Sequence, residues 1–178
     1  MTIENPTSTE PLLHVVMHEP EIPNNTGNIG RTCVTTGCAL HLIHPLGFDI
    51  DDPARRRAGL DYWPRLNLRE HDDWAAYTAT TSNSTPSARR WLLTTRTDRS
   101  FYDVQLQPGD HVVFGRESKG LPDEIIDAEP ESCLCLPMRA SERSLNVSVT
   151  AGIVIYEAVR RAIATGHTTL DPRGRLPE

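Results

Sequence analysis

The chain has 178 residues, of which 38% are apolar, and a formal net charge of −6; this length fits one domain with an ordinary core, which excludes a disordered or fibrous chain. No stretch approaches the roughly 18 consecutive apolar residues of a membrane span, and the polar start of the chain lacks the features of a secretory signal, so we expect a soluble, cytoplasmic protein. The acidic balance argues against bulk electrostatic attraction to nucleic acid, for which basic domains are usual.

Short apolar runs alternate with amphipathic segments along the chain. In the first half of the chain, the pattern predicts a strand at 12–17, a helix from Asn24 or Asn25 to about Cys38 with Gly37 as its stop, a strand at 40–43, a turn at 45–49, a basic helical turn at 53–58 and a helix at 72–79. In the second half, it predicts a loop at 82–87, strands at 91–94 and 111–114, a helix at 122–128, a strand at 132–136 and a long helix at 144–164. This alternation indicates an α/β fold with a mainly parallel sheet and helices on both faces. We expect one domain at 12–164, between a polar tail at 1–11 and a C-terminal tail at 165–178.

The last predicted helix is apolar around most of its circumference. Its apolar residues are Leu145, Val147, Val149, Ala151, Ile153, Val154, Ile155, Ala158, Val159 and Ile163. A surface helix needs only one apolar stripe, so one face can pack on the sheet while the rest needs another cover. In a domain of this size a second subunit is favoured over complete burial, which predicts a homodimer through this helix.

The cysteines and arginines give weaker signals. Cysteines 33, 38, 133 and 135 are expected to be reduced thiols, and the set Cys33, Cys38, His41 and His44 matches no usual zinc spacing, so we expect no metal. All cations except Lys119 are arginines, with a cluster at 55–57. Genomic base composition and the fit of guanidinium groups to phosphate both explain this preference.

Three segments that follow predicted strands carry the polar and glycine residues of a candidate site. They span 19–31, 114–122 and 136–146. In open α/β sheets, ligands collect at the carboxyl ends of the strands, so these segments predict one shared site. None of them contains a dinucleotide-binding Gly-x-Gly-x-x-Gly, a phosphate-loop Lys-Ser/Thr or a nucleophile elbow, which argues against dehydrogenase, NTPase and hydrolase functions.

In order and spacing, the three segments resemble the motifs of the SpoU branch of the SPOUT RNA methyltransferases. The matching stretches are Pro-x-Asn-Thr-Gly-Asn-Ile-x-Arg, Phe-Gly-x-Glu-x-x-Gly-Leu-Pro, and Ser-Leu-Asn before the long helix. Arg-Arg-Ala-Gly-Leu-Asp-Tyr at 56–62 is similar to the small single-domain tRNA ribose 2′-O-methyltransferases. The resemblance covers about 12–164 and implies a Rossmann-like sheet with a C-terminal trefoil knot, a dimer that buries the long helix, and S-adenosyl-L-methionine bound by the knot loops.

The resemblance also implies the residues of the site. Those implied for the cofactor are Leu93, Gly115, Glu117, Leu136, Met138, Ser144, Leu145 and Asn146. Those implied for catalysis are Arg31, Ser144 and Asn146. Those implied for RNA contact are Asn28, Arg31, Arg139, Arg143 and Tyr156.

Other interpretations of these residues stay open from the sequence. Arg31 could form a surface salt bridge, Glu117 could only fasten a loop, and Tyr156 could be an ordinary buried aromatic residue. The arginines could form an exposed charged face. Gly30 stands where such proteins often carry an apolar residue, and within a helix it should cost about 0.5–1 kcal/mol relative to alanine.

The implied activity is S-adenosylmethionine-dependent 2′-O-methylation of the wobble nucleotide of tRNA, a cytidine or uridine at position 34. Two alternatives remain: the same reaction on another RNA such as rRNA, and an RNA-binding homologue that does not methylate. Because a guanidinium with a pKa above about 12 is hard to deprotonate, we expect Arg31 to clamp a phosphate rather than to act as a free base.

Overall fold

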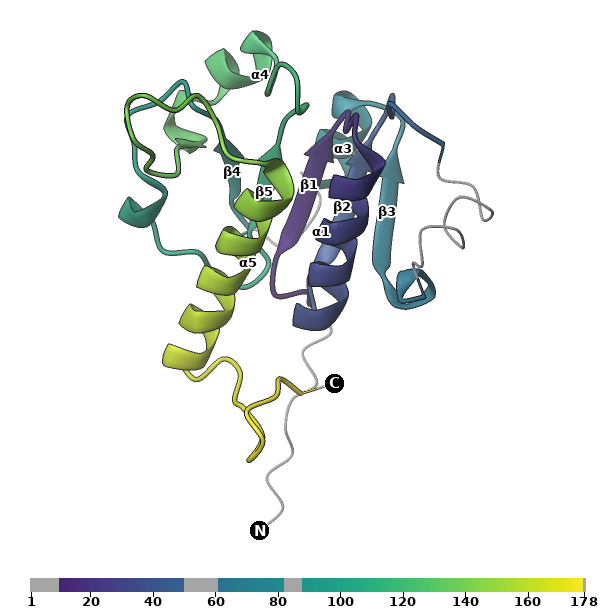
Figure 1. Ribbon diagram of the computed structural model, residues 1–178, viewed down its shortest axis with the longest axis vertical. Coiled ribbons are helices and arrows are strands. Elements are labelled where there is room, and N and C mark those ends of the chain that lie inside the picture. The colour runs from purple at the N-terminus through teal and green to yellow at the C-terminus, as the bar shows by residue number, and fades with distance from the viewer. Residues whose placement is uncertain (1–9, 50–60, 82–87, 178) are drawn as a thin grey trace.

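The computed structural model describes residues 10–49, 61–81 and 88–177 (Figure 1). Its sheet has the strand order β3-β2-β1-β5-β4-β6, and each described strand pair is parallel. The strands are β1 (His14–His18), β2 (Ala39–Ile43), β3 (Asn67–His71), β4 (Arg90–Leu93), β5 (His111–Phe114) and β6 (Cys133–Leu134). The predicted α/β fold with a mainly parallel sheet is confirmed.

Helices cover both faces of the sheet. The α-helices are α1 (Pro23–Thr36), α3 (Trp74–Thr81), α4 (Asp123–Ala128) and α5 (Val147–Ala164), and 3-10 turns lie at Trp63–Arg65, Phe101–Asp103 and Pro130–Ser132. Because side chains alternate along a strand, Val15 and Met17 pack in the core beneath α1 and α5, whereas Val16 packs in the core beneath α3 and α4. The helices thus enclose two separate cores, one on each face. The trefoil knot stays a prediction from the resemblance.

The predicted start of the first helix is wrong. α1 begins at Pro23, its N-cap is Ile22 and no side chain caps it. A proline suits the first helical position because its missing N–H would have no partner there, and it leaves Asn25 inside the helix. The predicted stop is confirmed: Gly37 has φ 70°, a left-handed conformation that glycine adopts without penalty.

β3 was not predicted. Its sequence is Asn-Leu-Arg-Glu-His, and of its side chains only that of His71 is buried. Because β3 forms an edge of the sheet, one side of it needs no apolar residues, so the usual alternating pattern is missing. The predicted basic turn at 53–58 and the predicted loop at 82–87 lie outside the described residues.

α5 has two apolar faces, as the sequence predicted. Its inner face, which includes Val154 and Ile155, is buried in the core, whereas Val149, Ile153 and Tyr156 on its outer face are 37–57% exposed. The spacing of four and then three residues places these three side chains in one row. α5 begins at Val147 rather than at 144, because the side chain of Asn146 caps it. In the described ranges, no helix is long and apolar enough to cross a membrane.

His18 at the end of β1 makes stability depend on pH. It is 3% exposed and faces Trp74 of α3, with 5.9 Å between ring centroids. Burial, and secondarily the charge of Arg116, lowers its pKa from 6.5 to about 4, although the carboxylate of Glu19 lies 3.6 Å from its Nε2. In the unfolded chain the pKa returns to about 6.5, so below that pH the unfolded state binds the extra proton. The stabilisation is therefore complete above pH 6.5 and is lost as the pH falls to 4.

We expect the buried neutral His18 to account for about 3 kcal/mol of the stability lost between pH 7 and pH 4, at 1.36 kcal/mol per pKa unit. The measurement is denaturant unfolding at both pH values for the wild type and His18→Gln. The variant should lose about 3 kcal/mol less than the wild type, whereas the control His167→Gln, at an exposed position, should match it. Equal losses in the wild type and His18→Gln would contradict the expectation.

Candidate active site

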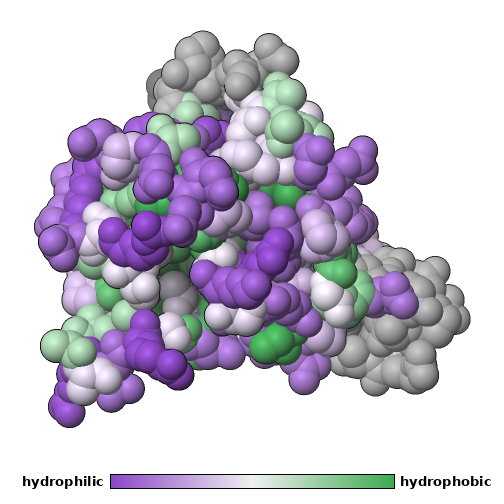
Figure 2. Space-filling view, turned by 90° about the horizontal axis from the view of Figure 1, so that it is seen from above, coloured by the Kyte–Doolittle hydropathy of each residue, from purple (hydrophilic) through white to green (hydrophobic). Residues whose placement is uncertain are grey.

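Four loops meet at the carboxyl ends of the strands, at the top of Figure 1. They follow β1, β4, β5 and β6 and surround a pocket of about 460 Å³. Seen from above, hydrophilic side chains dominate this rim and hydrophobic residues show between them (Figure 2). The three segments selected from the sequence therefore meet at one place.

The residues implied for cofactor binding lie together. All of them line the pocket: Leu93, Gly115, Glu117, Leu136, Met138, Ser144, Leu145 and Asn146. They come from the ends of β4 and β5 and from the long segment between β6 and α5. Residues up to 53 positions apart in the sequence thus share one cavity, while their role in binding stays a prediction.

The loop after β5 folds back tightly on itself. Arg116 N donates to Gly120 O at 3.1 Å, and Gly120 N donates to Arg116 O at 2.8 Å. A Cβ on Gly115 would lie 2.1 Å from the carbonyl carbon of Gly120 and 2.2 Å from the nitrogen of Leu121. Only glycine fits at 115, because these neighbours are backbone atoms that cannot rotate away. Gly120 has φ 72° but open space around its missing Cβ.

Gly115→Ala should damage the pocket far more than Gly120→Ala. At 115 the added methyl group forces the loop apart, whereas at 120 it adds only the roughly 1–2 kcal/mol strain of a left-handed conformation. Binding of S-adenosylmethionine, measured by calorimetry, should be lost in Gly115→Ala and retained in Gly120→Ala, with circular dichroism to check folding. Equal binding by the two variants would contradict this account of the loop.

Glu117 joins the loop after β5 to the start of α1. Its Oε2 accepts from Glu21 N at 2.8 Å, and its Oε1 accepts from Ile22 N at 3.3 Å and from Asn25 Nδ2 at 3.0 Å. The same two loops are joined a second time, because Ser118 donates through its N and Oγ to the Glu21 carboxylate. These two bonds lower the pKa of the Glu21 carboxyl. Glu117 thus holds the two loops together, while a role toward the cofactor stays a prediction.

Asn25 extends this connection to α5. Its Oδ1 accepts from Asn146 Nδ2 at 3.0 Å, and Asn146 Oδ1 in turn accepts from Ser148 N at 2.9 Å at the first turn of α5. Glu117, Asn25 and Asn146 therefore form a continuous hydrogen-bond chain through all three segments. Asn25 is 5% exposed, so the chain is shielded from water at its centre. From the sequence, Asn25 belonged to the first of the three segments of the candidate site, but its bonds to Glu117 and Asn146 were not predicted.

Arg31 lies on α1 outside the pocket lining. Its guanidinium carbon is 4.4 Å from the ring centroid of Tyr62, and its Nη2 is 3.4 Å from Asp61 Oδ1. Its side chain is 56% exposed. The surface salt bridge that the sequence left open as an alternative is thus present, and the planar guanidinium also lies against an aromatic face. The predicted role as a phosphate clamp stays a prediction.

Tyr62 is itself fixed to α1. It is 2% exposed, and its hydroxyl donates to the carbonyl oxygen of Gly27. A Cβ on Gly30 would lie 3.3 Å from side-chain atoms of Trp63 and Leu66. Gly30 therefore lets the segment after residue 60 pack tightly on α1, which explains a glycine inside a helix. Asp61 and Tyr62 were noted in the sequence only as part of a motif, without a role.

The residues implied for RNA contact are all exposed but do not form one cluster around the pocket. Asn28 and Arg31 lie on α1, Arg139 and Arg143 lie in the segment before α5, and Tyr156 lies on the outer face of α5. Tyr156 is 57% exposed in the single chain, so the interpretation of Tyr156 as an ordinary buried aromatic residue is wrong there. The arginine cluster at 55–57 lies outside the described residues.

Comparison with known proteins gives a consistent result. Residues 12–156 match the SpoU rRNA Methylase family. A tRNA (cytidine(34)-2′-O)-methyltransferase of Burkholderia pseudomallei is 47% identical over 152 residues, which cover 85% of this chain and 96% of the relative. The protein of the same name from Yersinia pestis is 45% identical, with coverages of 84% and 94%.

Solved structures show the same similarity. A structure described as giving insights into the 2-OH methylation of C/U34 on tRNA has a TM-score of 0.77 and 43% identity, and covers 86% of this chain and 97% of its own. An RNA methyltransferase structure from Bacillus anthracis, described as putative, has a TM-score of 0.76 and 42% identity, with coverages of 84% and 93%. On the sequence match and this shared fold, the chain belongs to the SpoU rRNA Methylase family.

Proposed function

We propose that this protein transfers a methyl group from S-adenosyl-L-methionine to the ribose 2′-hydroxyl of nucleotide 34, a cytidine or uridine, of tRNA. The observation that carries the proposal is the pocket at the rim of the sheet, which gathers all the residues implied for the cofactor. Support for the substrate comes from relatives at 43–48% identity that are named tRNA (cytidine(34)-2′-O)-methyltransferases. We place the reaction in the cytoplasm, with residues 12–164 as the methyltransferase domain.

The pocket fits the cofactor in size and chemistry. Its volume of about 460 Å³ lies within the roughly 300–1,000 Å³ of small-molecule sites. Leu93, Leu136 and Leu145 offer apolar walls for an adenine ring, and the missing side chain at Gly115 lets backbone groups approach a ligand closely. Ser144 and Asn146 also line the pocket, where they can orient the amino-acid end.

The chemistry asks the protein mainly for alignment. When bound, S-adenosyl-L-methionine supplies a methyl group on a positively charged sulfur for in-line transfer. Positioning two reactants can supply about 7–11 kcal/mol of barrier reduction. The hydrogen-bond chain of Glu117, Asn25 and Asn146 fixes the three loops relative to one another. It therefore also fixes the position of the pocket relative to α1, which carries Arg31. The proposed reaction needs no metal.

Arg31 is assigned to the RNA rather than to the cofactor. It lies six residues beyond Asn25, about 9 Å along the axis of α1. Its guanidinium is held by Tyr62 and Asp61, which orients its donors for two parallel bonds to a phosphate. In this position it can hold the phosphate next to the acceptor ribose, and that phosphate can receive the hydroxyl proton.

We also propose that two copies pair through the outer face of α5. Val149, Ile153 and Tyr156 are exposed in the single chain, and a second copy would remove them from water. The implied role of Tyr156 in RNA contact requires that its hydroxyl stay accessible at the edge of this interface. Arg139 and Arg143, exposed before α5, are the proposed phosphate contacts on this side.

The test is transfer of a tritiated methyl group to unmodified tRNA, followed by mass-spectrometric mapping of the labelled nucleotide. The proposal expects label on the 2′-oxygen of nucleotide 34. Label on rRNA alone would favour the same reaction on another RNA. RNA binding without label on any RNA would favour a homologue that binds without methylating, and would overturn the proposal.

A further inference from the structure

Three buried histidines gather far from the methyl-transfer pocket. His14 and His111 begin β1 and β5, where they are paired residues, and His41 lies in the neighbouring β2. They are 7%, 5% and 1% exposed. Because parallel strands all run in one direction, these positions near the starts of the strands lie toward the edge opposite the pocket. The function proposed above uses none of them.

The ring nitrogens of this histidine cluster (His14, His41 and His111) converge. One ligand atom from each residue lies within 4.8 Å of the others. His14 Nδ1 lies 2.9 Å from His41 Nε2, whereas the rings of His14 and His111 are stacked at 4.2 Å, so one of these two rings must rotate before both can coordinate one ion. All three rings are buried, so their nitrogens face one another rather than solvent.

Outer contacts orient two of the three rings. His41 Nδ1 lies 2.9 Å from His71 Nε2, and His111 Nδ1 lies 3.0 Å from the hydroxyl oxygen of Tyr77. When Nδ1 donates in both cases, the lone pairs of His41 and His111 are on Nε2, and that of His41 accepts from His14 Nδ1 until an ion replaces this bond. Metal-binding histidines almost always have such an outer partner for the second ring nitrogen, because it fixes the tautomer and the ring plane.

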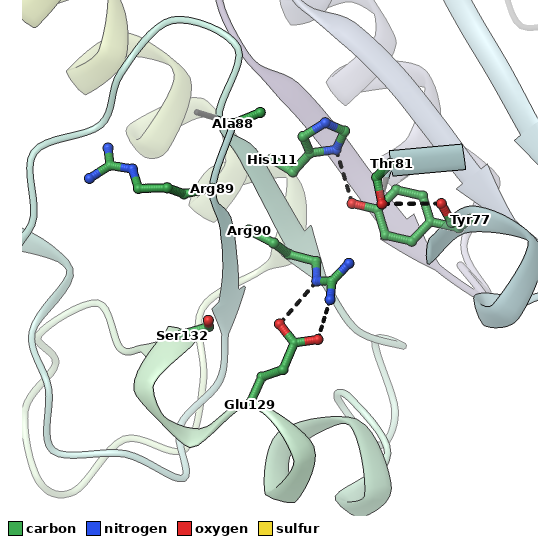
Figure 3. Close-up of a pocket in the computed structure, with 8 residues that line it drawn as sticks. All are labelled: Tyr77, Thr81, Ala88, Arg89, Arg90, His111, Glu129 and Ser132. Carbon is green, nitrogen blue, oxygen red and sulfur yellow. Dashed lines mark hydrogen bonds and ion pairs between the residues drawn. The ribbon is translucent and has the colours of Figure 1, made fainter. Parts of the chain in front are cut away.

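A second pocket reaches the cluster at His111. It has a volume of about 280 Å³, and His111 and Tyr77 form part of its wall (Figure 3). Arg90 also lines this pocket, and its guanidinium is paired with the carboxylate of Glu129 (Figure 3). Three protein ligands and an open side leave room for a water molecule as the fourth ligand of a tetrahedral ion.

We propose that His14, His41 and His111 form a binding site for a transition-metal ion of the Zn²⁺ class. Imidazole ligands suit zinc, copper and nickel, whereas Mg²⁺ and Ca²⁺ require oxygen ligands. Zn–N distances of about 2.0–2.1 Å in a tetrahedral site separate the nitrogens by roughly 3.3 Å. The 2.9 Å contact of His14 and His41 therefore opens by about 0.4 Å, nitrogens up to 4.8 Å apart move closer, and the ion replaces the hydrogen bond of His14 and His41. The charges of Arg69 and Arg90 oppose a cation, so direct coordination must supply the affinity.

The proposed site departs from the expectation of no metal, and it is not the set of Cys33, Cys38, His41 and His44, whose spacing matches no usual zinc pattern. Cys33 and Cys38 belong to the core beneath α1 and α5, on the face of the sheet opposite to the cluster. His44 instead contacts Glu70 at 3.0 Å. Only His41 of that set takes part, because the ligands come from three strands that are distant in sequence but adjacent in the sheet.

The experiment is titration of untagged protein with Zn²⁺, and with Co²⁺ as a spectroscopic probe. We expect one ion per chain, visible absorption bands of tetrahedral Co²⁺, and unchanged binding in the control His167→Gln. Tyr77→Phe, which removes an outer partner, should weaken binding by roughly 10–100-fold. His41→Gln and His111→Gln should weaken binding by more than this. Methyl transfer by the wild type should be the same with and without Zn²⁺.

Absence of ion binding, or equal binding by the wild type and the folded histidine variants, would overturn the proposal. Circular dichroism establishes folding of each variant. If His41→Gln does not fold, the proposal is tested by His111→Gln, on the pocket wall, and by the Co²⁺ spectrum of the wild type. A spectrum without tetrahedral bands would contradict the site. Since methyl transfer and metal binding are read out separately, failure of either leaves the other proposal standing.

Discussion

Arg31→Ala should lower the rate of methyl transfer to tRNA by about 10²–10³-fold, the usual effect of removing one charge-stabilising donor from a reacting centre. Affinity for S-adenosylmethionine should not change, because Arg31 lies outside the pocket lining. Folding should also persist, since the side chain is 56% exposed and its partners stay anchored to α1 without it. The measurements are single-turnover kinetics with tRNA and calorimetric binding of the cofactor.

Arg31→Lys serves as the matched control for charge. Lysine keeps the positive charge but loses the planar fork that stacks on Tyr62 and binds a phosphate through two bonds. We expect its rate to lie between those of the wild type and Arg31→Ala. Full activity of Arg31→Ala on tRNA would remove the residue from the mechanism, and loss of cofactor binding in that variant would show that it acts on the pocket instead.

Ile153→Asp should convert the proposed homodimer into monomers and lower methyl transfer with it. Ile153 lies in the middle of the outer row of α5, between Val149 and Tyr156. In a twofold interface the substitution introduces a charge from each subunit. An unpaired buried charge costs several kcal/mol, so we expect a shift of about 3 kcal/mol or more, roughly a hundredfold in the dissociation constant. Analytical ultracentrifugation measures it.

Ala75→Asp is the matched control for the dimer. It places the same charge at an exposed position on α3, on the opposite face of the sheet, and should leave the dimer intact. Val154 is unsuitable for this test, because it is completely buried in the core and its replacement would damage the fold. A monomeric wild type, or an Ile153→Asp variant that still dimerises like the wild type, would contradict the proposed interface.

Strands with buried faces were predictable from the sequence, and the charged edge strand was not. β1, β2 and β5 are apolar runs that lie within a residue or two of their expected positions. β3 has one buried side chain, so its pairing with β2 depends on tertiary contacts that no local pattern encodes. β6 is shorter than the expected strand at 132–136, because Cys135 forms only an isolated bridge with Ser100.

The location of the site was predictable, but its internal connections were not. Glycines and polar residues after strands indicated the rim, and the pocket lies there. The bonds of Asn25 to Glu117 and Asn146 join residues 92 and 121 positions apart, a pairing that spacing alone cannot reveal. The contact of Arg31 with Tyr62 likewise depends on close packing at Gly30, which the sequence presented only as a cost to helix stability.

The most direct measurement is a crystal structure of the protein with S-adenosyl-L-methionine. We predict the adenosyl group between Leu93, Gly115 and Leu136, with its methyl group directed toward the side of the pocket on which Arg31 lies. Density for the ligand at any other place, or no density in this pocket at a saturating concentration, would contradict the account.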